Sequence, residues 1–252
     1  MTKVNFWDVS PITSPDMKSL ELYDYKTPGI PRRYWRRKDF APVSDYLMSF
    51  QEDLTRDFLK GYNTLEEAVK AKRLIGAFDD RHELDNMDIS ELVLNNAKSD
   101  LKAWKVFPFR YEHKRVGRED TYIERIKSHP TAFKLMHKFK GDVAIASYSV
   151  IEPHSVIERH TGPENRDGEY LRIHIPLIIP KGDVFFECLG EVITWDDIWG
   201  FNNQLIHSAH NYTDEYRLVF FIDLRRTAIG LEPGEPFDEK WQIHAKPFVR
   251  EQ

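Results

Sequence analysis

The sequence lacks the features that mark secreted, membrane-spanning and nucleic-acid-binding proteins. One cysteine among 252 residues, Cys188, excludes a disulfide within the chain and is typical of a reducing compartment. The longest apolar runs, such as residues 177–179 and 218–222, are far too short to span a bilayer, and the first residues lack a secretory signal. Neither sign of charge dominates, because the chain has 36 Lys and Arg residues and 41 Asp and Glu residues, so its formal net charge is −5. We therefore expect a soluble cytoplasmic protein with neither nucleic acid nor membrane as a main partner.

The first 140 residues have the pattern of an irregular and helical layer. Prolines punctuate residues 1 to about 40, and apolar residues at helical spacing follow. Thr64 and Glu67 have the spacing of a capping box, and Pro130 suits a first helical position. The predicted helices cover residues 42–62, 64–77, 88–97 and 130–139.

Short segments rich in β-branched and aromatic residues, bounded by Gly, Pro, Asn or Asp, fill residues 141–227. About eight strands in about 85 residues, with no helix between them, indicate an antiparallel barrel or jelly roll. The predicted fold is mainly β with flanking helices around a double-stranded β-helix (jelly-roll, cupin-like) core. We expect a single domain in which a layer (1–140) and a tail (228–252) flank this core. The strongest predicted strands cover residues 143–151, 171–179, 183–189, 192–195, 198–201 and 216–224.

Two predicted strands carry basic residues among apolar ones. Arg172 and His174 alternate with aliphatic residues, so they share one strand face, which turns either to a core or to solvent. Arg217 opens a nearly continuous apolar run of the kind that is buried on both faces. Asp223 on the same strand is about 20 Å away, too far for a direct pair. The guanidinium of Arg217 therefore needs either a carboxylate ligand or an acidic side chain from another element.

Two histidines stand at predicted strand edges. His160 ends a strand that enters a polar loop, and His207 lies between two later strands. Neutral imidazole binds iron, zinc, copper and nickel, so the pair is a candidate metal site without a specified metal. Because the chain has ten histidines, the pair alone does not establish one.

Separated motifs follow one another along residues 149–226: Ser149, His160-Thr161-Gly162-Pro163-Glu164-Asn165, Arg172-Ile173-His174, His207 and Arg217. In this order they resemble the aspartyl/asparaginyl β-hydroxylase family of iron(II) and 2-oxoglutarate-dependent oxygenases. A weaker resemblance reaches back to about Trp104, and the first 100 residues show none.

The resemblance implies a role for each motif. In the family, the histidines matching His160 and His207 bind iron(II). The arginine matching Arg217, helped by the serine matching Ser149, holds the distal carboxylate of 2-oxoglutarate. His160, His207 and Arg217 are then the catalytic residues, dioxygen is the co-reactant and ascorbate an optional reductant. The family's arginine and histidine that match Arg172 and His174 contact the other carboxylate of 2-oxoglutarate, near the metal.

The chain departs from most 2-oxoglutarate oxygenases at the third metal ligand. Those enzymes have His-x-Asp, whereas this sequence has Gly162, which offers no side chain to a metal. Members of the resembled family share this glycine, and water fills the position. Glu158 is the alternative ligand, two residues before His160. The loop after His160 is longer than expected through residues 166–169, and residues 202–203 are Asn where the family often has acids.

Three further features have less specific interpretations. We expect His210 to be structural despite its closeness to His207, and His154 to be a loop residue rather than a substrate contact. The basic, aromatic run 32–38 fits either a solvated face, which we favour, or a site for phosphate or an acidic partner.

The expected reaction is hydroxylation of a C–H bond in an amino acid, free or bound to a carrier protein, or in an aspartyl- or asparaginyl-type side chain. Some family members hydroxylate lipids, a substrate that the lack of a membrane segment disfavours here. Two alternatives remain open: a cupin-like metalloenzyme without 2-oxoglutarate, and a non-catalytic jelly roll that binds a small acid or a partner. Only the oxygenase needs Arg217 for turnover.

Overall fold

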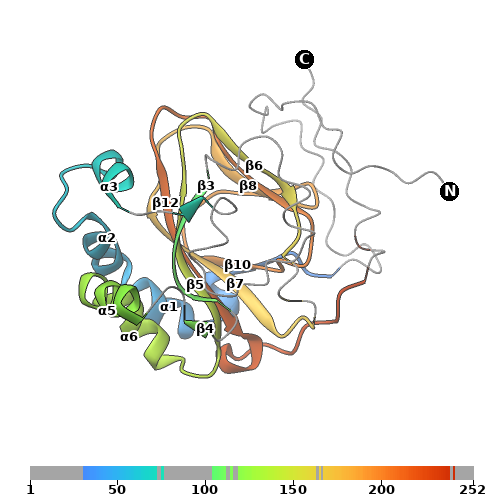
Figure 1. Ribbon diagram of the computed structural model, residues 1–252. Helices are drawn as coiled ribbons and strands as arrows, with labels where there is room; N and C mark the ends of the chain where they lie inside the picture. Colours follow the sequence, from blue (N-terminus) through green and yellow to red (C-terminus); the bar gives the residue numbers. More distant parts are fainter. Residues whose placement is uncertain are drawn as a thin grey trace, which may run out of the picture.

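The chain folds into two facing antiparallel sheets with helices packed on one of them (Figure 1). The structure, a computed structural model, describes residues 31–72, 75–76, 104–111, 114–115, 119–162, 165, 167–238 and 241. Among these residues, none of the helices is long and apolar enough to cross a membrane.

The larger sheet has the strand order β1-β10-β7-β12-β5-β3-β2, with β4 paired to β3, and the smaller has the order β6-β11-β8-β9. The larger sheet contains β1 (Tyr34–Arg36), β2 (Ile75–Gly76), β3 (Trp104–Tyr111), β4 (Lys114–Arg115), β5 (Val143–Ile151), β7 (Tyr170–Ile178), β10 (Trp199–Phe201) and β12 (Arg217–Arg225). The smaller contains β6 (Ser155–His160), β8 (Val184–Cys188), β9 (Glu191–Ile193) and β11 (His207–Asn211). The helices are α1 (Val43–Met48), α2 (Gln51–Leu59), α3 (Leu65–Ala71), α5 (Glu119–Ser128) and α6 (Pro130–Lys138), with 3-10 turns η1 (Arg37–Asp39) and η4 (Arg226–Ile229).

The predicted jelly roll is confirmed: β5 to β12 follow one another between residues 143 and 225, and the described residues between them form no α-helix. The capping box also forms, since the Glu67 amide donates to Thr64 Oγ1 at 3.1 Å and the Thr64 amide to Glu67 Oε2 at 3.3 Å. The prediction over 42–62 is two helices, α1 and α2, and the helix expected to reach 77 ends at Ala71. The helix predicted over 88–97 lies outside the described residues.

The first 140 residues contribute more than a helical layer. Strand β3 pairs along β5, and β1 pairs with β10, so both extend the larger sheet. Neither of these strands nor helix α5 was predicted from the sequence. The jelly roll therefore includes two strands, β1 and β3, that come before its continuous segment of residues 143–225.

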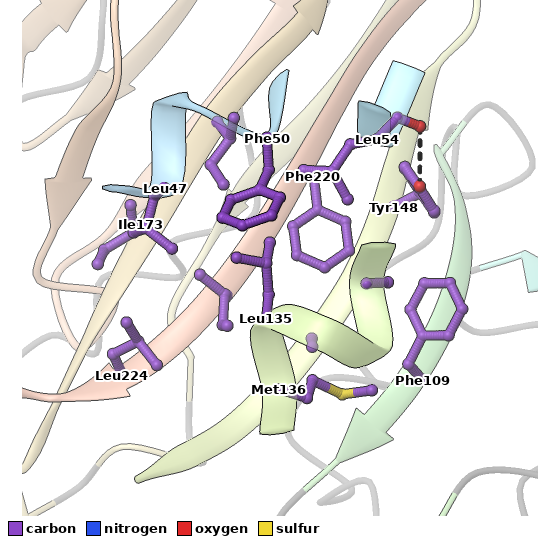
Figure 2. Close-up of a cluster of buried hydrophobic side chains, with 14 of the residues drawn as sticks. Leu47, Phe50, Leu54, Phe109, Leu135, Met136, Tyr148, Ile173, Phe220 and Leu224 are labelled. Atoms are coloured by element: carbon purple, nitrogen blue, oxygen red, sulfur yellow. Dashed lines mark hydrogen bonds between the residues drawn. The ribbon is translucent and has the colours of Figure 1, made fainter. Parts of the chain in front are cut away.

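Side chains on the central strands of the larger sheet point alternately to its two faces. One face packs against the helices, and the other faces the space between the sheets. On β12, Leu218, Phe220 and Leu224 pack with the helices, whereas Val219 belongs to the cluster between the sheets. Figure 2 shows the helix-facing core, where the Tyr148 hydroxyl donates to the Leu54 carbonyl at 2.9 Å. The side chains of opposite parity on β5, β7 and β12 are thereby turned toward the smaller sheet.

Candidate active site

Pairing of β6 with β11 brings the two predicted histidines together. His160 is the last residue of β6, His207 is the first of β11, and the two are opposite each other in the antiparallel register. Their ring centroids are 4.2 Å apart at an angle of 56°. Sequence reasoning placed His207 between strands; it lies instead within β11, which pairs with both β6 and β8.

His207 is held as a neutral imidazole with one nitrogen committed to the protein. Its Nδ1 lies 2.7 Å from the Leu205 carbonyl oxygen, so Nδ1 carries the proton and donates it, leaving Nε2 with its lone pair. Burial, and then the neighbouring His160, lower the pKa of His207 well below its ordinary value. A neutral ring with a fixed tautomer is the form that binds a metal ion.

The position two residues after His160 has no room for a third protein ligand. The Gly162 amide donates to the Asn203 carbonyl at 2.6 Å. A Cβ on Gly162 would lie 2.5 Å from Asn203 Nδ2 and 3.1 Å from Asn203 O. Within the described residues no three His, Cys, Asp or Glu side chains are grouped to hold a metal, and the Glu158 side chain lies outside them. The described donor set is therefore the histidine pair.

Arg217 brings a buried cation to the same space. It is the first residue of β12 and is 1% exposed. Its Nη1 donates to Ser149 O and Oγ over the long distances of 3.3 and 3.5 Å, and its Nε has no hydrogen-bond partner among the described atoms. Burial lowers the pKa of Arg217 to about 9, so the group is still charged at neutral pH. A buried, incompletely bonded guanidinium is suited to an anionic ligand.

Arg172 and His174 turn to the space between the sheets, which resolves the orientation that the sequence left open. The Arg172 guanidinium makes two parallel bonds to Asp223, from Nε and Nη2, both of 2.8 Å. His174 Nδ1 accepts a hydrogen bond from Trp195 Nε1 at 3.1 Å. Burial, and then the charges of Arg217 and Arg172, lower the pKa of His174 well below its ordinary value, so the ring is neutral.

All six site residues predicted from the sequence line one cavity between the sheets. Its walls are otherwise mostly apolar and aromatic, so the polar groups are few and converge on a small space. The lining residues are Ser149, His160, Arg172, His174, His207 and Arg217, together with Trp104, Ile157, Phe186, Phe201, Ser208, Ala209 and Phe221.

Comparison with known proteins identifies the family to which the chain belongs. The sequence profile of aspartyl/asparaginyl β-hydroxylase matches residues 67–227, which is more than half of the chain. The chain belongs to the aspartyl/asparaginyl β-hydroxylase family. Membership confirms the resemblance carried by the motifs and supports a hydroxylase function.

Curated relatives match the chain over a shorter segment. The human aspartyl/asparaginyl β-hydroxylase is 29% identical over 107 residues, covering 39% of this chain and 13% of that protein. The ornithine lipid ester-linked acyl 2-hydroxylase of Rhizobium tropici is 30% identical over 104 residues, covering 40% of this chain and 36% of the relative. The matched segments thus span well under half the length of these relatives.

Among solved structures, a prolyl hydroxylase from Trichoplax adhaerens, in complex with a hypoxia-inducible-factor peptide, aligns with a TM-score of 0.38 at 9% identity. The alignment covers 76% of this chain and 93% of that one. A 2OG-Fe(II) oxygenase family oxidoreductase from Burkholderia pseudomallei gives 0.34 at 14% identity, over 65% and 85% of the two chains. The fold assignment rests on the strand topology of this chain itself.

Sequence reasoning missed the aromatic residues that hold the polar groups in place. The Trp104 indole donates to Ser149 Oγ at 3.0 Å, and the Arg217 guanidinium lies 4.8 Å from the Trp195 ring centroid. Asp223 was considered only as a partner of Arg217; its carboxylate faces Arg172 on the adjacent strand. Local sequence carries no signal for this pair, because the register of β7 against β12 decides it.

His210 and His154, for which the sequence predicted no role in the site, do not line the cavity. His210 is buried, with its Nε2 2.9 Å from Ser208 Oγ and its ring stacked on Phe185, so a structural role fits. His154 is exposed in a turn and bonds Asp214 at 2.7 Å, as expected of a loop residue.

The basic run 32–38 forms β1 and the turn after it. Arg37 pairs with Asp45 at 2.6 Å and Asp197 at 3.4 Å, as on a solvated face. Arg33 differs, since it is buried and lies 3.4 Å from Glu191.

Proposed function

We propose that the protein is an iron(II) and 2-oxoglutarate-dependent hydroxylase. The observation that carries this proposal is the buried Arg217, whose Nε has no hydrogen-bond partner among the described residues, in the same cavity as the histidine pair. A metal site alone would need no such cation. A small dicarboxylate that binds metal at one end and a guanidinium at the other accounts for both.

His160 and His207 would hold the metal. The bond from His207 Nδ1 to the Leu205 carbonyl fixes the ring, so that Nε2 is the ligating atom. Among the described residues Gly162 offers no side-chain oxygen beside the pair, so in this proposal the cosubstrate and water supply the remaining ligands. When bound, iron(II) and 2-oxoglutarate supply the oxidative decarboxylation that makes dioxygen able to hydroxylate a C–H bond.

Arg217, with Ser149 beside it, would bind the distal carboxylate. Its fork of donors suits two parallel hydrogen bonds to carboxylate oxygens, and a ligand oxygen near Nε would pair with an atom that has no partner in the described part of the chain. Arg172 and His174 would contact the other carboxylate. Because Asp223 balances the charge of Arg172, Arg217 supplies the net positive charge of these side chains.

The aromatic walls would shelter the reaction. The ring centroids of Phe186 and Phe201 lie 5.5 and 4.9 Å from the centroid of the His207 ring. The centroids of the Trp104 and His160 rings are 5.6 Å apart. Apolar walls keep bulk water from the metal face and strengthen the charge interactions inside the cavity.

The proposed substrate is an amino acid, free or carrier-bound, or an aspartyl- or asparaginyl-type side chain. The named relatives include an aspartyl/asparaginyl β-hydroxylase and a lipid acyl hydroxylase, so the substrate panel should contain amino acids, acidic peptides and ornithine-containing lipid.

The decisive experiment incubates the protein with iron(II), ascorbate, 2-oxoglutarate and this panel, and measures succinate together with a gain of one oxygen in the product. Arg217→Lys keeps the charge but loses the fork, so its KM for 2-oxoglutarate should rise by about 10-fold or more. His154→Ala, altered in an exposed turn, is the matched control and should behave as wild type. Absence of succinate with every substrate, together with no metal-dependent binding of 2-oxoglutarate, would exclude the proposal.

A further inference from the structure

Trp195 lies in the loop between β9 and β10, and no motif in the sequence predicts that it belongs to the site. The residue is only 2% exposed and sits behind the cavity wall rather than on it. Its indole nevertheless contacts two of the residues that line the cavity, His174 through its edge and Arg217 through its face.

The edge of the indole determines which nitrogen of His174 carries a proton. Trp195 Nε1 can only donate, and it lies 3.1 Å from His174 Nδ1, so that Nδ1 must be the acceptor. A neutral ring with an unprotonated Nδ1 carries its proton on Nε2. No hydrogen bond from Nε2 is made to the described residues, so its N–H is available to an acceptor in the cavity.

The face of the indole supports the guanidinium of Arg217. The Arg217 Cζ lies 4.8 Å from the Trp195 ring centroid, within range of a cation–π interaction. The other contacts of this guanidinium, with Ser149 O and Oγ, are 3.3 and 3.5 Å long. The indole is therefore a main restraint on where the guanidinium sits.

We propose that Trp195 is a positioning residue that fixes the spacing between the Nε2–H of His174 and the guanidinium of Arg217, and thereby selects the length of the cosubstrate. The proposal rests on the function proposed above, in which these two residues bind opposite ends of a 2-oxo diacid. Because one rigid ring contacts both residues and the proposed cosubstrate is 2-oxoglutarate, we expect the spacing between them to suit its five carbons better than the four of oxaloacetate or the six of 2-oxoadipate.

The first test measures the tautomer of His174 and does not depend on enzymatic turnover. Long-range ¹H–¹⁵N correlation spectra of the metal-free protein report which nitrogen of each histidine ring is protonated. Wild-type His174 should be the Nε2–H tautomer, and Trp195→Phe, which keeps a ring but lacks the N–H, should give a mixture of tautomers. Trp199→Phe is the matched control, because Trp199 also packs against His174, at 4.6 Å, but donates to the Thr194 carbonyl. It should leave the tautomer unchanged.

The second test measures selectivity by calorimetric titration of the Mn(II)-loaded protein with the three diacids. Wild type should prefer 2-oxoglutarate by about 10-fold or more, and Trp195→Phe should weaken 2-oxoglutarate binding by about 10-fold, the effect of one lost hydrogen bond. Its preference should fall accordingly.

The outcomes separate this inference from the proposed function. If wild type binds none of the diacids, the proposed function fails, while the tautomer spectra still report on Trp195. If wild-type His174 carries its proton on Nδ1, the positioning role is overturned even where no variant folds. It is also overturned if Trp195→Phe keeps both the tautomer and the selectivity.

Discussion

At the scale of single residues, the cavity is organised by a buried ion pair as much as by its open groups. Asp223 is 1% exposed and accepts both bonds from Arg172, whose guanidinium also lies 4.9 Å from the Phe221 ring centroid. Adjacent strands place the two residues directly opposite each other. Removing one member would leave a desolvated charge facing the other strand.

Asp223→Asn should therefore destabilise the protein by about 3 kcal/mol, because the Arg172 charge would lose its compensation. The double variant Arg172→Gln with Asp223→Asn removes both charges, and its cost should be smaller than the sum of the single costs by about 2 kcal/mol. Urea denaturation of the metal-free proteins measures both quantities. Strictly additive costs would show that the two side chains are not coupled.

At the scale of elements, the sequence predicted strands whose pattern is local and missed those that depend on their neighbours. The prediction over 143–151 matches β5 residue for residue. Strand β3 was missed because Pro108 interrupts it, and proline normally argues against a strand interior. The structure accommodates it at a register shift between Pro108 and Arg110, where β3 pairs with β5.

The strand that begins with His207 illustrates the same limit. Strand β11 reads His-Ser-Ala-His-Asn, which has little β propensity, and its extended form follows from pairing with both β6 and β8. The histidine pair could be predicted from the family motifs. The Trp195 and Asp223 contacts could not, since they join segments whose register no local pattern specifies.

The junction of α5 and α6 adds a pH dependence to stability. His129 is buried there among the Phe107, Phe109 and Tyr148 rings, and burial, then the charge of Lys72, lowers its pKa to about 3. In the unfolded chain a histidine titrates near its usual value, so below about pH 6.5 only the unfolded state gains the proton. The contribution of His129 is complete above pH 6.5 and is lost as the pH falls toward 3.

Wild type should consequently lose about 1–2 kcal/mol more stability than His129→Phe between pH 7 and pH 5. Urea denaturation at a series of pH values measures the difference. His154→Gln, which alters an exposed histidine, should keep the wild-type slope. A wild-type slope in His129→Phe would mean that His129 titrates normally in the folded protein.

At the scale of the whole molecule, the site joins the two sheets. The histidine pair belongs to the smaller sheet, on β6 and β11, whereas Ser149 and Arg217 belong to the larger, on β5 and β12. A metal and a dicarboxylate bound together would connect these layers across the cavity. Ligand binding should then stabilise the fold as a unit.

Mn(II) and 2-oxoglutarate together should raise the melting temperature by more than the sum of their separate effects, because each completes the site of the other. At about 100 times the Kd, a single ligand contributes about 2.7 kcal/mol. In thermal unfolding, His207→Ala should lose the Mn(II) increment. Arg217→Ala should keep the Mn(II) increment and lose the one from 2-oxoglutarate. An Arg217→Ala protein that retains both increments would contradict the bridging arrangement.

The short strands at the margins of the larger sheet also bear on self-association. In the part of the chain that the structure describes, this sheet begins with β1, of three residues, and ends with β2, of two. Strand β1 covers β10, and the Asn202 amide extends the ladder by donating to the Arg33 carbonyl at 3.0 Å. Uncovered backbone at such a margin is a template for pairing with another molecule. Strand β1 therefore covers the edge of β10, which pairs on its other side with β7, the strand that carries Arg172 and His174, and loss of β1 should favour edge-to-edge aggregation.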